Sequence, residues 1–351
     1  MTYIAKPPVH HPALQKNALG LTRRDYEGAI TTLCAGCGHD SITAAIVQAF
    51  WELSIAPHKV AKLSGIGCSS KTPAYFLREA HGFNGVHGRM PALVTGANAA
   101  NGDIIYIGIS GDGDSLSIGL GQLCHAIRRN VNVLYVLENN GVYGLTKGQF
   151  SASADPGSLS KKGEANTMDA IDGCLLALTL GATFVARSFS GDKGQLVPIL
   201  KAGLAHKGFA FVDVISPCVT FNDHEGSTKS YAYTREKNVE VVQADFVLPA
   251  GAITTAHDPG TVRTVTLHDG STVRLRKVAD DYDTTDRDRS YTYIREAQKE
   301  GEVVTGLLYL SPSSNDLHEQ NQTVETPLAH LPYEELCPGS AELEKLQKGF
   351  R

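Results

Sequence analysis

Four cysteines lie in glycine-rich or proline-containing loops, where their thiolates could bind a metal. Cys34 and Cys37 form a CxxC pair, Cys68 follows a Gly-Ile-Gly turn, and Cys218 follows a Ser-Pro pair. Such thiolates suit a redox disulfide, a zinc ion or an iron–sulfur cluster. The spacing alone does not decide between zinc and iron–sulfur. We expect the four to form one metal site, with a disulfide or simple packing as the alternative.

The other three of the seven cysteines have a simpler interpretation. Cys124 and Cys174 fall in predicted helices and Cys337 in the C-terminal tail, where buried packing is the usual role of a cysteine. An odd number of cysteines in a reducing compartment argues against a disulfide framework. The count therefore favours metal or redox chemistry at the first four.

A second group of residues has the chemistry of a divalent cation site. Gly111-Asp112-Gly113-Asp114 follows a buried apolar run, and Asn139-Asn140 follows the next one. A single helix lies between them, so the two strand ends come close together in a β-α-β crossover. Carboxylate and amide oxygens, with water and phosphate oxygens, are the ligands that Mg²⁺ prefers. The glycines and the helix that begins near Ser115 would admit a diphosphate.

Alternating strands and helices position both groups. The sequence predicts strands at 59–64, 103–109, 131–138, 182–187 and 209–215, and helices at 39–53, 115–129, 168–180 and 192–206. Near-continuous apolar strands in this order predict an α/β fold: a doubly wound, mostly parallel sheet. Ligands of such sheets bind at the carboxyl ends of the strands, where the cysteines, Asp112 and the asparagines all fall.

Composition excludes several classes of protein. The 351 residues are 42% apolar and 20% charged, with a net charge of −5, which excludes general disorder and a basic nucleic-acid-binding surface. No apolar run approaches the roughly 18 residues of a membrane span. The N-terminus has no apolar signal core, so we expect a cytoplasmic protein.

Length divided by roughly 150 residues per domain suggests about two domains, or one large domain with an extension. We expect a loose arm at 1–30, the α/β domain at 31–235 and a C-terminal extension at 236–351. The extension should contain a β-hairpin at 262–276, a charged stretch at 277–302, a polar tail at 311–326 and a short helix or arm at 333–348.

These motifs together carry a resemblance to a known family. The GDG-to-NN spacing resembles the cofactor-binding motif of thiamine-diphosphate-dependent enzymes. With the four cysteines added, roughly residues 30–235 resemble the β subunit of the 2-oxoacid:ferredoxin oxidoreductases. The loop after Asn140, with Tyr143, Thr146 and Gln149, looks most like the 2-oxoglutarate branch.

The resemblance implies a role for each motif. Asp112, Asn140 and the backbone carbonyl of Val142 would bind Mg²⁺. The four loop cysteines would ligate one 4Fe–4S cluster. The thiamine diphosphate site would be lined by Gly111, Asp112, Gly113, Asp114, Asn140, Val142, Gly144, Leu145 and Thr146.

Four basic residues are candidates for the substrate pocket. Lys71 could pair with a substrate carboxylate, and Lys147 lies in the loop after Asn140. His87 and Arg89 could contact the diphosphate or the substrate. A solvated surface position is the alternative for Lys71, His87 and Arg89.

The implied reaction is the oxidative decarboxylation of 2-oxoglutarate with coenzyme A to succinyl-CoA and CO₂, or its CO₂-fixing reverse. Electrons would pass through the cluster to ferredoxin. The family takes the glutamate that activates thiamine from a separate pyrimidine-binding domain, so an α subunit is implied, in an α2β2 heterotetramer. The alternatives are the same chemistry on pyruvate or another 2-oxoacid, a thiamine enzyme without the cluster, and a zinc-stabilised scaffold or electron-transfer module.

Overall fold

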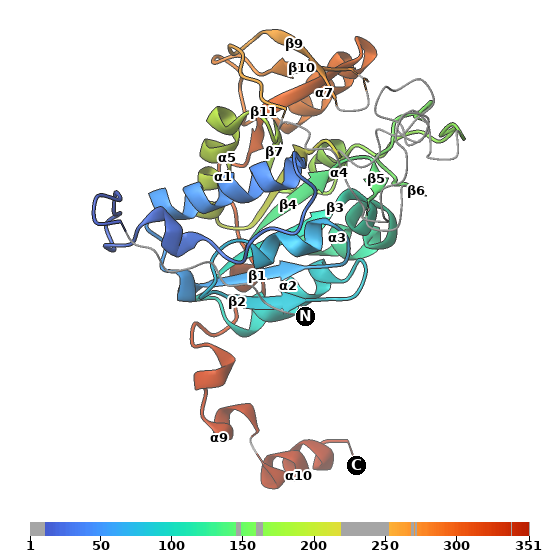
Figure 1. The fold of residues 1–351 in the computed structure, drawn as a ribbon. Coiled ribbons are helices and arrows are strands. Elements are labelled where there is room, and N and C mark those ends of the chain that lie inside the picture. Colours follow the sequence, from blue (N-terminus) through green and yellow to red (C-terminus); the bar gives the residue numbers. More distant parts are fainter. Residues whose placement is uncertain are drawn as a thin grey trace, which may run out of the picture.

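A twisted β-sheet forms the centre of the structure, and helices pack around it (Figure 1). The computed structural model describes residues 11–144, 149–158, 164–218, 253–267, 270, 272–337 and 339–350. Within this part of the chain the sheet has nine strands. In spatial order they are β2 (His81–Asn84), β1 (Val60–Ser64), β3 (Ile105–Gly111), β4 (Val133–Asn139), β8 (Phe209–Ile215), β7 (Phe184–Phe189), β11 (Glu302–Leu310), β10 (Thr272–Lys277) and β9 (Val262–Thr266).

The first six strands of that order are mutually parallel. Strand β11 runs antiparallel to β7, β10 runs parallel to β11, and β9 closes a hairpin with β10. The carboxyl ends of β1, β3, β4 and β8 therefore meet at one edge, as the predicted α/β sheet requires.

Helices cover both faces of the sheet. One core cluster joins the sheet to α1 (Gly38–Glu52) and α5 (Lys193–Ala205). The opposite cluster joins it to α2 (Met90–Ala100), α3 (Leu120–Arg128), α4 (Gly173–Thr179) and α7 (Arg287–Lys299). This double cover confirms the doubly wound fold.

Strand β4 shows why the central strands are apolar throughout. Leu134 and Val136 belong to one core cluster, whereas Tyr135 and Leu137 belong to the other. A strand with both faces covered must be apolar at successive positions. The Tyr135 ring also stacks on Phe209, with centroids 5.6 Å apart, and each such buried side chain contributes about 1.5–3 kcal/mol.

The predicted elements of the α/β region are present, with two displaced helix starts. The helix predicted at 115–129 is preceded by a π-helical turn at Gly113–Ile118 and continues as α3. The helix predicted at 168–180 begins only at Gly173, because the Asp172 carboxylate accepts the backbone N–H groups of Cys174 and Leu175 and caps it. Strand β2 and helix α2 were not predicted.

The extension joins the same sheet. The predicted hairpin is confirmed as β9 and β10, with part of its turn outside the described residues. Helix α7 and strand β11 were not predicted, because the charged composition of 277–302 masked the helix and Gly306 interrupts the apolar run of the strand. The expected domain boundary at residues 235–236 lies outside the described residues.

The two ends of the chain differ. The expected loose arm is wrong for its later part, since Tyr26 is fully buried against the α1 core. Its hydroxyl also accepts a hydrogen bond from Asn17 Nδ2 at 2.8 Å. After α8 (Leu317–Asn321), the predicted C-terminal arm extends from the body as α9 (Tyr333–Leu336) and α10 (Ser340–Lys348).

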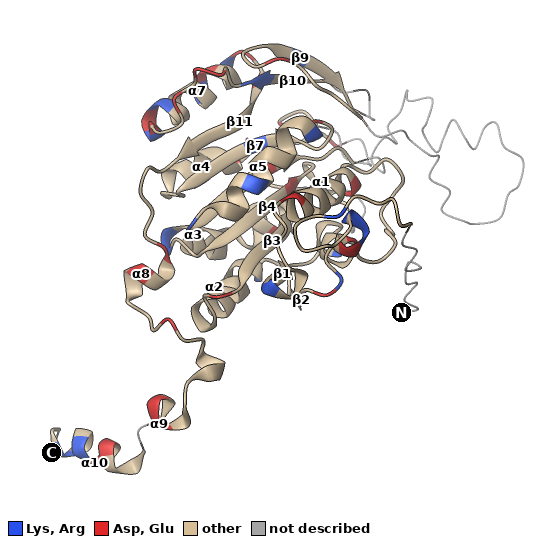
Figure 2. Cartoon of the chain, turned by 90° about the vertical axis from the view of Figure 1, so that its left-hand side faces the viewer, with Lys and Arg blue, Asp and Glu red and all other residues tan. Residues whose placement is uncertain are grey.

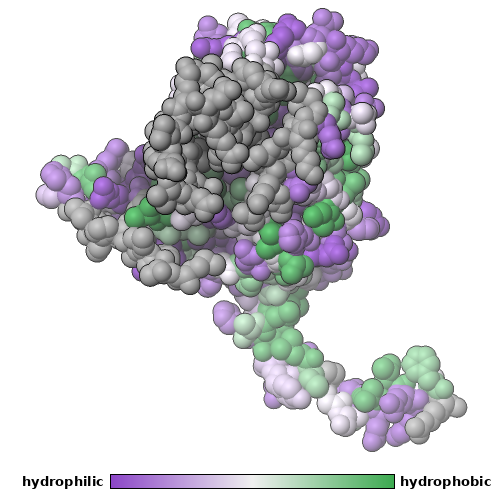
Figure 3. Space-filling view, turned by 45° about the vertical axis from the view of Figure 1, so that its right-hand side comes forward, coloured by the Kyte–Doolittle hydropathy of each residue, from purple (hydrophilic) through white to green (hydrophobic). Residues whose placement is uncertain are grey.

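Charged and apolar side chains are distributed differently on the surface. Figure 2 shows Lys, Arg, Asp and Glu interspersed over the helices, in keeping with the small net charge. Figure 3 shows hydrophobic residues along the C-terminal arm, where Tyr333, Leu346 and Phe350 are 72%, 62% and 87% exposed. No helix in the described ranges is long and apolar enough to span a membrane.

Candidate active site at the carboxyl edge of the sheet

A pocket opens where β1, β3 and β4 end. It contains about 460 Å³ of space free of protein atoms, part of it open to solvent. It is lined by His39, Ile66, Gly67, Cys68, Ser69, His87, Gly111, Asp112, Gly113, Asp114, Glu138, Asn140, Val142, Tyr143 and Gly144. The structure thus brings the GDG turn, the second asparagine and Cys68 to one pocket.

Asp112 lies at the floor of this pocket. Its carboxylate is buried and accepts hydrogen bonds from the hydroxyls of Ser151 and Ser153, the latter at 2.7 Å. Burial raises the pKa of Asp112, and the two hydroxyls oppose that rise. A buried carboxylate of this kind is well suited to a cation, which would compensate its charge.

Asn140 faces the same pocket from a tight turn. Its side-chain oxygen accepts the backbone N–H of Val142 at 3.1 Å, and Gly141 between them has φ +75°. Val142 and Tyr143 then form the short strand β5 (Val142–Tyr143), which pairs with β6 (Gln149–Phe150). The carboxylate, the amide oxygen and the backbone carbonyls form a set of oxygen donors of the kind Mg²⁺ binds.

Asp114 has a different environment from Asp112. Its carboxylate accepts the backbone N–H of Gly88 at 2.7 Å and the Ser110 hydroxyl at 2.9 Å. A Cβ on Gly65 would lie 1.9 Å from this carboxylate. Asp114 therefore ties together the turns after β1 and before α2, which form part of the pocket wall.

Tyr143 closes the pocket over Gly113. The tyrosine hydroxyl donates to the Gly113 carbonyl at 3.1 Å. A Cβ on Gly113 would approach the tyrosine ring to 2.4 Å, so only glycine allows this contact.

Two buried titratable groups form part of the pocket lining, His39 and Glu138. His39 Nδ1 lies 2.5 Å from the Ser216 hydroxyl and 3.7 Å from a Glu138 oxygen. The Glu138 carboxyl accepts the Thr72 hydroxyl at 3.0 Å. Burial lowers the pKa of His39 to about 4 and raises the pKa of Glu138 well above its ordinary value. Burial therefore favours the neutral form of both side chains.

The structure brings Cys37 towards Cys218. The Gly38 N–H, the first of α1, donates to the Pro217 carbonyl at 3.2 Å. A Cβ on Gly38 would lie 2.5 Å from the Ser216 hydroxyl, so glycine permits this approach. Burial raises the pKa of the Cys37 thiol, and its electrostatic interaction with Cys218 acts in the same direction.

Cys68 is brought near Cys34 in a comparable way. Burial raises the pKa of the Cys68 thiol; the charge of Lys71 opposes that rise, and electrostatic interaction with Cys34 adds to it. Lys62 holds the segment after Cys68 in place, since its ammonium donates to the carbonyls of Pro73, Phe76 and Leu77 at 2.7–2.9 Å. All four loop thiols thus lie at the carboxyl edge of the sheet.

The thiols do not converge on one point. No three His, Cys, Asp or Glu side chains of the described ranges are grouped as ligands of a single ion. In a 4Fe–4S cluster each thiolate binds a separate iron, so its ligands need not meet at one atom. The four thiols have the chemistry of ligands for a zinc ion or for a 4Fe–4S cluster.

The remaining predicted residues have varied surroundings. Gly144 lies in the pocket lining, His87 is exposed at its rim, and Arg89 is exposed at the start of α2. Lys71 is half-buried in the short helix Ser69–Ala74. Leu145, Thr146 and Lys147 lie outside the described residues.

Sequence reasoning missed several residues of the site. Ser151 and Ser153 lie in a loop without periodicity, which gave no signal for a contact with Asp112. Glu138 is the second-last residue of the apolar strand β4, and a lone acid in that position could have indicated a strand-end site. His39 is the first residue of the helix predicted at 39–53, and the structure adds its contact with Ser216.

Comparison with protein families identifies one matching domain. Residues 65–214 match the model described as "Thiamine pyrophosphate enzyme, C-terminal TPP binding domain". This segment contains the GDG turn, Asn140 and most of the pocket lining.

Three curated relatives are similar to more than half of the chain. The 2-oxoacid:ferredoxin oxidoreductase subunit beta of Sulfolobus sp is 43% identical over 54% of this chain and 63% of its own length. The 2-oxoglutarate oxidoreductase subunit KorB of Mycobacterium tuberculosis is 40% identical over 60% of this chain and 58% of its own. The 2-oxoglutarate synthase subunit KorB of Methanocaldococcus jannaschii is 36% identical over 60% of this chain and 75% of its own. The match therefore spans less than two thirds of the first two relatives.

A solved structure extends the similarity over most of the chain. It is the 2-oxoglutarate:ferredoxin oxidoreductase from Magnetococcus marinus with 2-oxoglutarate, coenzyme A and succinyl-CoA bound. Its matching chain is 30% identical, with a TM-score of 0.68, over 88% of this chain and 91% of that one.

Proposed function

This chain belongs to the β subunits of the 2-oxoacid:ferredoxin oxidoreductases, and we propose that it forms the diphosphate-binding half of their active site. The complete enzyme would oxidatively decarboxylate 2-oxoglutarate with coenzyme A to succinyl-CoA and CO₂, or run the reverse reaction. Ferredoxin would exchange the electrons.

One observation carries the proposal. A buried carboxylate, Asp112, and the amide of Asn140 face a pocket whose wall also contains Cys68. Oxygen donors for a cation and thiols for a redox centre thus lie at a single sheet edge. A thiamine enzyme without a cluster would have no use for the thiols.

Asp112, Asn140 and the Val142 carbonyl would hold Mg²⁺ against the diphosphate, and the open backbone at Gly111 and Gly113 would admit it. Thiamine diphosphate, when bound, supplies the electron sink for loss of CO₂ from a 2-oxoacid. Tyr143 would cover one wall of this site, since its hydroxyl donates to the Gly113 carbonyl.

Cys34, Cys37, Cys68 and Cys218 would ligate one 4Fe–4S cluster. Thiols bind iron as thiolates, so ligation would reverse the raised pKa that burial gives Cys37 and Cys68. A cluster at this edge would lie beside the pocket, where electrons leave the substrate.

Lys71 is the proposed partner of a substrate carboxylate, with His87, Arg89 and Lys147 as further contacts to substrate or diphosphate. Lys71 is half-buried next to the pocket-lining Cys68 and Ser69. A cation there would favour 2-oxoglutarate, which has a second carboxylate, over pyruvate.

An α subunit would complete the site, in an α2β2 assembly. The relatives named as β subunits support a partner chain. It would provide the glutamate that activates the aminopyrimidine and most contacts to coenzyme A.

The cofactor assignment can be tested on protein purified without oxygen. We expect iron and acid-labile sulfide in equal amounts, a broad absorbance near ~400 nm typical of such clusters, and bound thiamine diphosphate. The variant Cys218→Ser should lose most of the iron, whereas the matched variant Cys124→Ser, on α3, should retain it. Zinc in place of iron, with no thiamine, would support the scaffold alternative instead.

The reaction can be tested by producing the chain with its α subunit. The complex should reduce ferredoxin with 2-oxoglutarate and coenzyme A faster than with pyruvate, and Asp112→Ala should abolish turnover. A β chain that turns over 2-oxoglutarate alone at the rate of the complex would contradict the need for a partner.

A further inference from the structure

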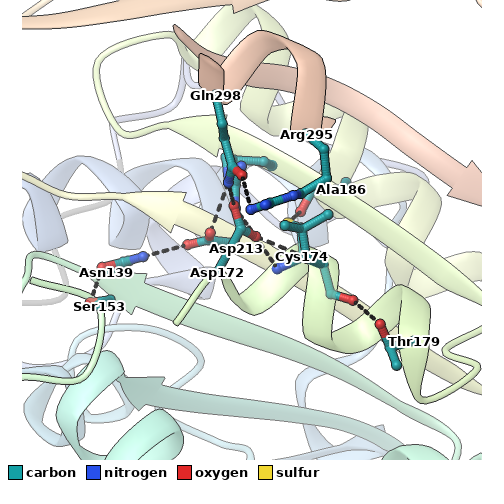
Figure 4. Close-up of polar contacts among 11 residues, drawn as sticks. Asn139, Ser153, Asp172, Cys174, Thr179, Ala186, Asp213, Arg295 and Gln298 are labelled. Atoms are coloured by element: carbon teal, nitrogen blue, oxygen red, sulfur yellow. Dashed lines mark hydrogen bonds and ion pairs between the residues drawn. The ribbon is translucent and has the colours of Figure 1, made fainter. Parts of the chain in front are cut away.

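A series of polar side chains, with buried Arg187 and Asp213 at its centre, connects the extension to the centre of the sheet (Figure 4). Gln298 of α7 donates to the Asp172 carboxylate at 2.7 Å. Arg187 of β7 donates to Asp172 at 2.5 Å and to Asp213 of β8 at 2.9 Å. One guanidinium thus holds two carboxylates, one at the start of α4 and one near the end of β8.

The same contacts continue to the floor of the pocket. Asn139 Nδ2 donates to the second oxygen of Asp213 at 3.2 Å. The Ser153 hydroxyl lies 2.9 Å from the Asn139 side-chain oxygen and 2.7 Å from the Asp112 carboxylate. We name the whole set the Asp213 network, and it consists of Gln298, Asp172, Arg187, Asp213, Asn139, Ser153 and Asp112.

Burial makes the centre of this network unusual. Arg187 is 4% exposed and Asp213 is 1% exposed. A buried ion pair is often no more stabilising than apolar side chains of the same volume. Its cost in desolvation suggests that it contributes something other than stability, namely a fixed orientation of the groups it contacts.

The chemistry of each group fixes that orientation. Asp213 accepts Arg187 at one carboxylate oxygen and Asn139 at the other, so Asn139 turns its NH₂ group towards it. The Asn139 carbonyl then faces the Ser153 hydroxyl, which has a single proton and lies within hydrogen-bond distance of Asn139, Asp112 and Ser151. With asparagine at position 213 the Asn139 amide is free to turn over, and the Ser153 hydrogen bond that orients the Asp112 carboxylate loses its fixed support.

We propose that Asp213 is a positioning residue for the Asp112 carboxylate, and that the C-terminal extension supports it through Gln298. Asp213 acts through Asn139 and Ser153 and does not itself contact the pocket. The inference rests on the proposed Mg²⁺ site at Asp112.

Outer partners of metal ligands typically change metal affinity by about 10–100-fold. We therefore expect Asp213→Asn to raise the Mg²⁺ concentration that half-saturates thiamine diphosphate binding by about 10-fold or more. Binding is measured by calorimetry on the full chain with its α subunit, across a Mg²⁺ series. Ser153→Ala should also raise the half-saturating Mg²⁺ concentration. This second variant tests the proposal if Asp213→Asn does not fold.

The matched control is Asn130→Ala, at the opposite edge of the sheet. Asn130 is also buried and polar, and it accepts the backbone N–H of Phe209 at 2.7 Å and donates to the Asn315 carbonyl at 2.8 Å. This variant should lower the melting temperature without changing the Mg²⁺ requirement. If Asn130→Ala raised the half-saturating Mg²⁺ concentration as much as Asp213→Asn does, the positioning role would be wrong. General destabilisation would then explain the effect of both variants.

Asp112→Ala separates the two levels of inference. If Asp112→Ala abolishes Mg²⁺-dependent binding but Asp213→Asn and Ser153→Ala leave it unchanged, the positioning role is wrong and the metal site stands. If Asp112→Ala itself binds thiamine diphosphate with an unchanged Mg²⁺ requirement, the proposed metal site is wrong. Gln298→Leu should raise the half-saturating Mg²⁺ concentration less than Asp213→Asn does. An unchanged Mg²⁺ requirement in Gln298→Leu would show that the extension does not support Asp213.

Discussion

His39 and Glu138 face each other across 3.7 Å with both side chains buried. Burial lowers the pKa of His39 to about 4 and raises the pKa of Glu138, so it favours the neutral form of each side chain. The two side chains therefore form part of the pocket lining, next to the proposed cluster and metal sites.

The first prediction concerns acid stability. Unfolded histidine titrates near pH 6.5, whereas folded His39 stays neutral down to about pH 4. The unfolded state thus binds the extra proton in that window, so the free energy of unfolding falls as pH drops from 6.5 to 4, by up to about 3 kcal/mol from this group. His39→Gln should lose correspondingly less stability when urea unfolding is compared at pH 7 and pH 5.

Asp112 and Glu138 contribute with the opposite sign, because burial raises the pKa of both. They are present in both proteins, so they cancel to first order in the difference between wild type and variant. An identical loss of stability in the two proteins would show that His39 is protonated in the folded state.

The second prediction concerns Gly113. Because a Cβ there would approach the Tyr143 ring to 2.4 Å, Gly113→Ala should displace Tyr143 and weaken thiamine diphosphate binding by at least ~10-fold. Gly121→Ala is the matched control, since a Cβ on this glycine of α3 would meet no described atom within 4 Å. The control should keep the affinity and gain up to about 1 kcal/mol of stability from helix propensity. Equal affinities for the two variants would mean that Tyr143 moves without consequence.

The third prediction concerns Lys71. If its ammonium pairs with the second carboxylate of 2-oxoglutarate, Lys71→Ala should raise KM for 2-oxoglutarate by about 10-fold or more and leave pyruvate kinetics nearly unchanged. Lys59, which is exposed before β1, provides the control variant Lys59→Ala. An unaltered preference between the two acids in Lys71→Ala would rule out the pairing.

The fourth prediction concerns the C-terminal arm. Every described residue from Pro332 to Phe350 is exposed, so the arm buries little surface against the body. Deleting residues 332–351 should change the free energy of unfolding of the chain by no more than about 0.5 kcal/mol, as measured in urea. A larger loss would show that the arm packs on the body in solution.

Local sequence patterns were sufficient to predict the fold of the central sheet. Continuous apolar runs such as that of β4 occur where both faces of a strand are covered, and the order of strands and helices then determines the parallel edge at which Asp112, Asn140 and the cysteines meet. The glycine and asparagine residues at the strand ends indicate a ligand site by their types and their spacing. For these reasons the fold class and the GDG and NN motifs could be predicted.

The extension could not be predicted in the same way. Strand β11 is stabilised by pairing with β7, more than a hundred residues earlier in the chain, and a single sequence carries no local signal of that pairing. The helix α7 has a charged outer face, and only its contact with the sheet through Ile294 and Ala297 decides which residues are buried.

Sequence by itself determined which chemical groups the protein has at its strand ends. Tertiary structure decided their environment: it buried Asp112 beside two serines, brought His39 to Glu138 across about a hundred residues of chain, and linked Arg187 to two carboxylates. The physical reason is that burial, pKa and hydrogen-bond partners depend on the segments that pack together. Those segments are distant in the chain and meet only in the folded sheet.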